Sequence, residues 1–415
     1  MTTFQYKLAS RAGPITVEDY RQLAKRAVPS MVWAYVDSGA EDLSTLKANR
    51  QAFERWCLRT KVLTGKDAKD LSVEVAGTQL SIPILLAPTG LSGISHWTGE
   101  VGAAQAAEGA GTRAILSTAA TYSIEEVGSA TTEDHFFQLY PWADASTGAR
   151  ALTESFLDRA KRSGFRALFV TVDVPIHGNR ESERKRGMGA PPVLTPARIA
   201  SAAIRPKWWY GFLRYQRMSV RNLVDQGGAR AAVRSVQAQY KYMRPELVWD
   251  DFAWMRELWD GPVYLKGVLD AEDAARAIDL GATGVVVSNH GGRQLDGAVA
   301  TLDALPAIAR RLDGQGEILI DGGIRRGSDI VKALCLGAKA VCIGRPYLYG
   351  LGARGPAGVA HVLNILREEV ARTMTLMGVE RLEDLDESWL IPANQVVPDE
   401  FFSGHVTGFG ARAGG

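Results

Sequence analysis

The sequence predicts a (β/α)8 barrel, and two patterns along the chain favour it. Eight short apolar runs recur between residues 82 and 346, and each is followed by polar or glycine residues. The runs do not alternate between apolar and polar residues, which is typical of parallel strands buried on both faces. Helix-like segments such as GEVGAAQAAEGAG and AEDAARAIDLGA lie between the runs. This repeat has the length of a barrel domain, typically about 250 residues.

The eight predicted strands can be read in chain order. They are IPILLAPTG, RAILSTAA, FFQLY, ALFVTVD, VYLKG, GVVVSNHGG, EILIDGG and AVCIGRP. An open, doubly wound sheet is the alternative α/β fold. It fits the sequence less well, because neither a reversal of strand order nor a Rossmann glycine fingerprint can be recognised.

The segment before the first strand is predicted to be helical. Thr16 followed by Asp19 is a capping signal, Pro29 interrupts the helical pattern, and Gly39 is a candidate stop. We therefore expect residues 1–80 to pack on the barrel as a helical segment. Residues 81–385 then form the barrel, and residues 386–415 form a C-terminal tail.

A long insertion is expected after the fourth strand, within residues 188–248. Its part from Arg198 to Arg244 holds ten Lys or Arg residues against a single acid, Asp225, and includes the run WWYGFLRY. One interpretation is a solvated active-site lid with a basic face. The other is a peripheral membrane anchor, since aromatic and cationic side chains suit the surface of an anionic bilayer.

Composition limits the classes of protein that the chain could belong to. The 415 residues are 46% hydrophobic and 23% charged, with a net charge of +2, which is ordinary for a soluble domain and gives no indication of nucleic-acid binding. Cys57, Cys335 and Cys342 show neither disulfide nor metal-site spacing, so we expect reduced thiols, no metal and a cytoplasmic location. No apolar stretch reaches about 18 residues, so any membrane contact would be peripheral, on the inner face of the cell membrane.

The chemistry is expected at the carboxyl ends of the barrel strands, where this fold places its active sites. A single histidine after a strand is more often structural, but all eight strands end in polar residues. Lys266 is costly to bury unpaired, so an anion or an electron-rich ring is expected beside it. The DGG and GRP motifs after the last two strands suit a phosphate site. The strand-end residues are Thr89, Ser117, Thr118, Gln138, Tyr140, Thr171, Asp173, Lys266, Ser288, His290, Arg293, Asp321, Arg325 and Arg345.

These motifs resemble a known family. SNHGGRQLD, at residues 288–296, looks like the active-site signature of the FMN-dependent 2-hydroxy acid oxidases and dehydrogenases, and FQLY, TVDVP, LKGV, DGGIRRG and IGRP also match in order. The resemblance covers roughly residues 15–385. It implies bound FMN and oxidation of an L-2-hydroxy acid, of lactate or mandelate type, to the 2-oxo acid. It also implies quinone or oxygen as electron acceptor and a homotetramer.

The resemblance also implies roles for the catalytic residues. His290 would be the base, and Asp173 would stabilise the imidazolium as it forms. Arg180 and Arg293 would bind the substrate carboxylate, because a guanidinium matches both of its oxygens. Tyr35 and Tyr140 would donate hydrogen bonds to the substrate.

A second group of residues would hold the flavin. Lys266 would lie near N1 and the C2 carbonyl and stabilise the anionic reduced ring. Ser117, Gln138 and Thr171 would hold the ring edge, and Pro88, Thr89, Gly90 and Ser288 would be further contacts. The ribityl chain and phosphate would be held by Asp321, Gly323, Arg325, Gly344 and Arg345.

Two residues depart from the glycolate-oxidase pattern. Gly90 stands where many of these oxidases have alanine beside the flavin, and Ala119 stands where glycolate oxidase has tryptophan over the substrate. Ala119 is expected to leave room for a bulkier side chain, such as an aromatic one, and glycine at position 90 resembles mandelate dehydrogenase and lactate monooxygenase. Both departures argue against simple glycolate oxidation. The alternatives are an oxygen-using oxidase or a lactate 2-monooxygenase, an FMN barrel that isomerises or reduces a phosphorylated substrate, and a barrel that only binds. A phosphorylated substrate would not require both Arg180 and Arg293.

Overall fold

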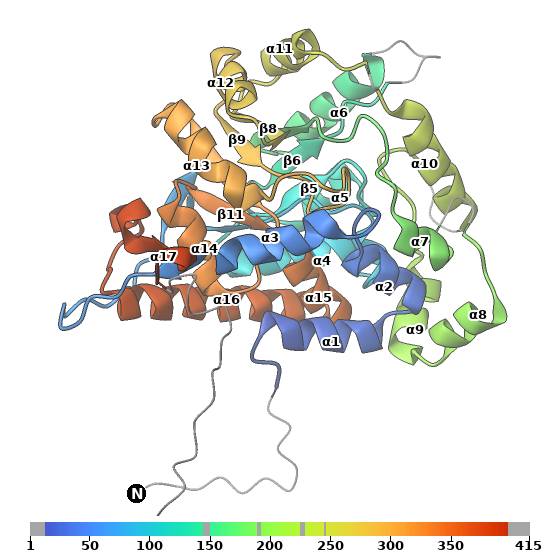
Figure 1. Ribbon diagram of the computed structural model, residues 1–415. Helices are drawn as coiled ribbons and strands as arrows, with labels where there is room; N and C mark the ends of the chain where they lie inside the picture. The colour runs from blue at the N-terminus through green and yellow to red at the C-terminus, as the bar shows by residue number, and fades with distance from the viewer. Residues whose placement is uncertain (1–12, 144–149, 189–191, 225–228, 245, 397–415) are drawn as a thin grey trace, which may run out of the picture.

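Eight parallel strands form the centre of the molecule. The computed structural model describes residues 13–143, 150–188, 192–224, 229–244 and 246–396. The strands are hydrogen-bonded in the order β4, β11, β10, β9, β8, β7, β6, β5, and a parallel bridge between Leu86 and Ala114 brings the two ends together. This confirms the predicted (β/α)8 barrel (Figure 1). The strands are β4 (Ile84–Leu86), β5 (Ile115–Ser117), β6 (Phe136–Leu139), β7 (Ala167–Thr171), β8 (Val263–Val268), β9 (Gly284–Val287), β10 (Glu317–Asp321) and β11 (Ala340–Ile343).

Helices surround the strands, as Figure 1 shows. The long helix α16 packs on α14, α15 and α4, and so covers one side of the barrel. The helices of the barrel are α4 (Gly99–Gly109), α5 (Ile124–Ala130), α6 (Ala151–Arg162), α11 (Trp249–Leu258), α12 (Ala271–Asp279), α13 (Thr301–Leu312), α14 (Gly327–Cys335), α15 (Arg345–Arg354) and α16 (Pro356–Met377). Short 3-10 helices lie at Ser92–Ile94, Leu382–Asp384 and Glu387–Trp389.

The barrel interior is filled by side chains. Phe169 stacks on Tyr264 with ring centroids 4.6 Å apart and packs against Phe136 at 5.8 Å. Leu85, Val286 and other buried residues complete this inner cluster. A filled interior leaves the open ends of the strands as the place for a binding site.

The N-terminal segment contains strands as well as the expected helices. The capping box predicted for Thr16 and Asp19 is present at the start of α1 (Val17–Ala27), and Pro29 precedes α2 (Ser30–Asp37). After α3 (Ser44–Glu54) come β1 (Trp56–Leu58) and the hairpin β2–β3 (Val73–Val75 and Thr78–Leu80), which the sequence analysis missed. β1 pairs antiparallel with β12 (Leu390–Pro392), and the short helix α17 (Ala393–Val396) follows. The first part of the expected C-terminal tail is thus joined to the N-terminal segment.

The insertion after β7 is helical. It contains α8 (Pro196–Ala203), α9 (Pro206–Tyr215) and α10 (Ala229–Tyr242), and the short helix α7 (Glu181–Lys185) precedes it. These helices form one flank of the molecule in Figure 1. The WWYGFLRY run lies in α9, whereas Asp225 falls outside the described residues. No helix in the described part of the chain is long and apolar enough to span a membrane.

Candidate active site

A cleft at the carboxyl ends of the strands brings most of the predicted site residues together. Its volume is about 1100 Å³, including the part open to solvent. The predicted residues that line it are Tyr35, Pro88, Thr89, Gly90, Ala119, Tyr140, Arg180, Lys266, His290, Arg293, Asp321, Gly323, Arg325, Gly344 and Arg345. The remaining predicted residues do not line the cleft themselves but bond or pair with residues of the lining or with one another. They are Ser117, Gln138, Thr171, Asp173 and Ser288.

His290 is held between a carboxylate and a phenol. Its Nδ1 lies 3.0 Å from Oδ1 of Asp173, and its Nε2 lies 3.3 Å from the hydroxyl of Tyr140. When Nδ1 carries the proton and donates a hydrogen bond to Asp173, Nε2 is left as the acceptor. The backbone of His290 has φ +57°, an unusual conformation for a residue other than glycine. The loop therefore aims one basic nitrogen at the phenol and the cleft.

Burial and charge set the protonation of this pair. Burial lowers the pKa of His290 below its usual value, and Asp173 opposes only part of that effect. Burial alone would raise the pKa of Asp173, but His290 and Lys266 bring it below its usual value. At neutral pH the pair is thus a neutral imidazole beside a carboxylate, which is the state that a general base requires.

Lys266 is buried in a closed polar triangle. Its Nζ lies 2.8 Å from Oδ2 of Asp321 and donates to the hydroxyl of Ser288 at 2.8 Å. Ser288 in turn donates to Oδ1 of Asp321 at 2.8 Å. Burial alone would lower the pKa of Lys266, but Asp321 and Asp173 raise it above its usual value. A permanent cation is therefore fixed at the cleft between β8 and β10.

The two predicted carboxylate-binding arginines differ in their surroundings. Nη2 of Arg293 forms an ion pair with Glu183 at 2.8 Å, and Nη1 donates to the carbonyl of Tyr35 at 2.8 Å. Arg180 donates only to uncharged groups, the carbonyl of Arg293 and the amide of Gln294, and no carboxylate of the described residues lies within ion-pair distance. Burial, followed by the charge of Arg293, lowers the pKa of Arg180. Of the two arginines, Arg180 is therefore the one whose charge is not balanced by a carboxylate of the described residues, and an anionic ligand would stabilise it more.

Comparison with known proteins agrees with this geometry. A family model described as FMN-dependent dehydrogenase matches residues 24–392. The chain belongs to this family. It is 41% identical to an L-lactate oxidase of Nostoc sp. over 383 residues, which is 91% of this chain and 98% of the relative. It is 38% identical to an L-lactate dehydrogenase of Acinetobacter baylyi, again over 91% of this chain and 98% of the relative. A crystal structure of the monotopic membrane protein (S)-mandelate dehydrogenase matches with a TM-score of 0.86 and 36% identity, over 92% of this chain and 100% of that one.

The chain is therefore an FMN-dependent 2-hydroxy acid oxidase or dehydrogenase. Its buried polar atoms fit the cofactor. Nε2 of Gln138, Oγ1 of Thr171 and Nε of Arg345 are buried without a hydrogen-bond partner in the described structure. Polar groups at such positions normally have partners, so these three are suited to a flavin edge and a phosphate. Burial lowers the pKa of Arg345 to about 10, as expected for a guanidinium that lacks a close counter-ion.

Gly90 and Ala119 are neighbours in the lining of the cleft. A Cβ atom added at Gly90 would lie 3.1 Å from Cβ of Ala119 and 3.5 Å from the hydroxyl of Tyr35. Two small residues in contact leave room beside the tyrosine. That a bulky substrate side chain occupies this space stays a prediction.

Several residues of the site escaped the sequence analysis. Trp142 lines the cleft and stacks on Tyr140 with ring centroids 5.4 Å apart, and its position just after the strand-end YP could have indicated it. Glu183 lies three residues after Arg180, in α7, and carries no motif of its own. Gln239 and Met243 reach the cleft from the insertion, and no local pattern marked them. The other additional lining residues include Val174, His177 and Leu348.

Proposed function

We propose that the protein oxidises an L-2-hydroxy acid of lactate or mandelate type to the 2-oxo acid, with His290 as the base. The observation that carries this proposal is that one cleft contains both an Asp173-bound imidazole and a half-buried arginine, Arg180, without a carboxylate partner among the described residues. A 2-hydroxy acid supplies both missing partners, since its carboxylate suits Arg180 and its C2–OH centre supplies the proton for His290.

The residues of the chain divide the work between binding and proton transfer. FMN, when bound, accepts the two electrons that leave the substrate. Arg180 binds the carboxylate, and Arg293 adds positive charge that Glu183 partly neutralises. Nε2 of His290 takes the proton, and Asp173 stabilises the imidazolium that results. The hydroxyls of Tyr140 and Tyr35 hydrogen-bond to the substrate oxygens. The same base serves removal of the C2 proton or of the hydroxyl proton.

The test is anaerobic bleaching of the flavin by a panel of 2-hydroxy acids, followed by air or a soluble quinone. We expect L-lactate or (S)-mandelate to bleach the flavin, and their D enantiomers not to. Fast reoxidation by air would identify an oxidase or a monooxygenase, and the recovery of a decarboxylated product would select the monooxygenase. If no 2-hydroxy acid bleaches the flavin, the proposal fails, and an isomerase or reductase acting on a phosphorylated substrate becomes the better hypothesis.

We further propose that α8 and α9 contact an anionic membrane surface. One face of α9 is fastened to the barrel, because Nε1 of Trp208 donates to the carbonyl of Ile94 at 2.7 Å and Tyr215 stacks on Trp97 at 4.1 Å. The opposite face exposes Leu213 (62%), and α8 has no buried residue at all. Other exposed apolar residues of this corner include Ile199, Ile204, Trp209 and Tyr210.

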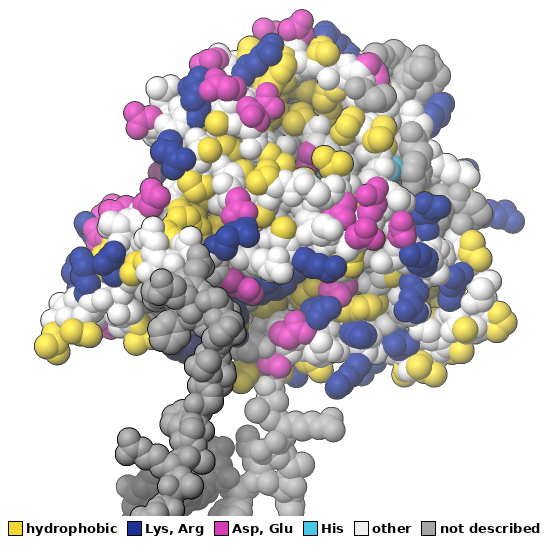
Figure 2. Space-filling model, viewed as in Figure 1, with side chains coloured by type: hydrophobic (Ala, Val, Ile, Leu, Met, Phe, Trp, Pro, Cys, Tyr) yellow, Lys and Arg dark blue, Asp and Glu magenta, His cyan; other side chains and the backbone are white. Residues whose placement is uncertain are grey.

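Cations accompany this apolar surface. Lys207 and Arg214 are exposed on α9, and Figure 2 shows hydrophobic side chains beside Lys and Arg at the corner that α8 and α9 occupy in Figure 1. Apolar side chains can enter the headgroup region while the cations attract anionic lipid, at about 1 kcal/mol for each cation near the surface. A protein of this kind would sit peripherally on the inner face of the cell membrane and pass electrons to quinone.

Sedimentation with lipid vesicles tests the membrane contact. We expect the protein to co-sediment with anionic vesicles at low salt and to be released as salt screens the cations. Leu213→Gln should weaken this binding, whereas Leu376→Gln, at a similarly exposed position of α16 (67%), should not. Equal binding of both variants would exclude α9 as the contact. Sedimentation velocity in the same buffers tests the homotetramer that the family resemblance implies.

A further inference from the structure

The helix α10 turns one stripe of side chains inward. Ala231, Ser235 and Gln239 are buried and spaced four residues apart, so they lie on one face of the helix. Gln239, together with Met243 just after the helix end, lines the active-site cleft. The insertion therefore supplies part of the catalytic cavity in addition to its outer surface.

Both sides of α10 are tied to the walls of that cleft. The backbone N–H of Val220 donates to the hydroxyl of Ser235 at 3.0 Å. Near the other end of the helix, the N–H of Ala143 donates to the carbonyl of Tyr242 at 3.0 Å, directly after Trp142 of the cleft wall. Gln239 lies between these two attachments.

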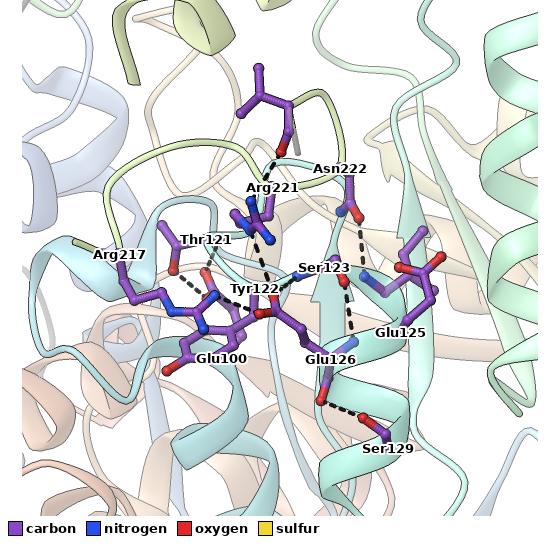
Figure 3. A network of polar contacts seen from close by, with 12 residues as sticks. Glu100, Thr121, Tyr122, Ser123, Glu125, Glu126, Ser129, Arg217, Arg221 and Asn222 are labelled. Carbon is purple, nitrogen blue, oxygen red and sulfur yellow. Dashed lines mark hydrogen bonds and ion pairs between the residues drawn. The ribbon is translucent and has the colours of Figure 1, made fainter. Parts of the chain in front are cut away.

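The segment that contains Val220 also forms hydrogen bonds to the residues that flank Ala119. Arg221 N–H donates to the carbonyl of Ala120 at 3.0 Å, and Nδ2 of Asn222 donates to the carbonyl of Thr118 at 3.0 Å. Figure 3 shows neighbouring side-chain contacts of the same segment, among them the ion pair of Arg217 with Glu126 at 2.8 Å. The insertion thus forms hydrogen bonds to the residues on both sides of Ala119. These bonds, together with those of Ser235 and Tyr242, fix the position of α10 next to the space beside Ala119.

The side-chain amide of Gln239 is unsatisfied in this position. Gln239 is only 8% exposed, and its Nε2 has no hydrogen-bond partner among the described residues. A buried polar group without a partner is costly, so a ligand that supplies the partner is favoured over one that does not. Trp142 and Met243 offer flat and flexible apolar surfaces in the same cleft.

We propose that Gln239 forms a polar subsite for the far end of the substrate side chain. The substrate class is a 2-hydroxy acid with an aromatic side chain that carries a hydroxyl or another hydrogen-bonding group on the ring. This proposal rests on the proposed function, because it places the carboxylate at Arg180 and the reacting carbon at His290. The ring then extends past Ala119 and along Trp142 toward the carboxamide.

The test compares (S)-mandelate with (S)-4-hydroxymandelate as reductants of the holoenzyme under anaerobic conditions. The wild-type protein should reduce its flavin with the hydroxylated acid at a kcat/KM at least about fivefold higher, the lower end of the effect of leaving a buried polar group unpaired. Gln239→Leu, of similar volume, should abolish that preference while mandelate still bleaches the flavin. Gln237→Leu is the matched control, because Gln237 lies on the same helix but is exposed.

Each outcome separates this inference from the proposed function. If mandelate bleaches the flavin but the wild type shows no preference, or if Gln239→Leu keeps the preference, the subsite is refuted while the proposed function stands. If Gln237→Leu loses the preference equally, the effect belongs to the helix and not to Gln239, which also refutes the subsite. If neither acid nor any other 2-hydroxy acid bleaches the flavin, the proposed function fails and the subsite falls with it. Retained FMN and mandelate bleaching in Gln239→Leu show that this variant is folded.

Discussion

Replacing Asp173 by asparagine tests how the cleft creates its base. Asp173 lies 3.0 Å from Nδ1 of His290 and opposes the effect of burial on the imidazole. Asparagine keeps the size and a hydrogen-bonding oxygen but removes the charge. A carboxylate this close typically raises the pKa of its partner by about 1 to 3 units, and each unit is worth about 1.4 kcal/mol. The variant should therefore reduce its flavin about 10- to 1000-fold more slowly on the plateau of the pH profile.

The pH dependence of the reduction rate should shift in a defined direction. The reaction requires neutral His290, so the rate falls as the pH drops through the pKa of that residue. Loss of Asp173 destabilises the imidazolium and lowers this pKa further, so the acidic limb should move to lower pH. Stopped-flow bleaching with a saturating substrate, at a series of pH values, measures the plateau and the limb together.

A purely structural role for Asp173 would give another result. Local distortion would lower the plateau and leave the acidic limb in place. An unchanged limb, a shift to higher pH, or a rate near that of the wild type would refute the reasoning. Asp279→Asn, at an exposed position of α12, is the control and should leave both features unchanged.

Three further substitutions test other parts of the site. Lys266→Met should lower the free energy of unfolding of the apoprotein by about 3 to 5 kcal/mol in urea titrations, because it leaves Asp321 buried without its cation; adding Asp321→Asn should recover part of the loss, and full stability of the single variant would contradict the ion pair. Arg180→Lys should weaken substrate binding and slow flavin reduction, because an ammonium cannot reproduce a bidentate fork; methyl esters that react as well as the free acids would exclude the carboxylate clamp. Ala119→Trp should depress reduction by mandelate more than by lactate, and equal losses would argue against a role in pocket size.

The barrel was predictable because its signals are local. Each buried parallel strand is a continuous apolar run, and each catalytic side chain follows directly after such a run, so the sequence alone could place His290 and Lys266 at the mouth of the barrel. The pairing of β1 with β12 was not predictable, since each strand has only three residues and the partners lie at opposite ends of the chain. Glu183 was missed for a related reason, because its burial results from a tertiary contact with Arg293.

The contribution of the insertion was the least visible in the sequence. Its composition indicated a solvated lid or an anchor, and neither interpretation identified which of its residues reach the cleft. Gln239 and Met243 line the cleft where α10 is held by hydrogen bonds of the 217–222 segment beside Ala119 and of Ala143. Contacts of this kind depend on three separate stretches of the chain and leave no periodic pattern in any of them.

The antiparallel pair of β1 and β12 has a consequence for the time course of biosynthesis. Residues 56–58 leave the ribosome early, but their partners at 390–392 are made roughly 330 residues later, which takes about 15 to 65 s at 5 to 20 residues per second. During that interval the exposed edge of β1 is without its partner and open to chaperones or to a neighbouring chain. The segment before this strand also supplies Tyr35 and the backbone carbonyl of Ser38, which accepts a hydrogen bond from Arg345 at 2.6 Å. Because Arg345 and Leu348 also line the cleft, a growing chain completes its cofactor cleft only late in translation, and β1 waits longer still for its partner strand.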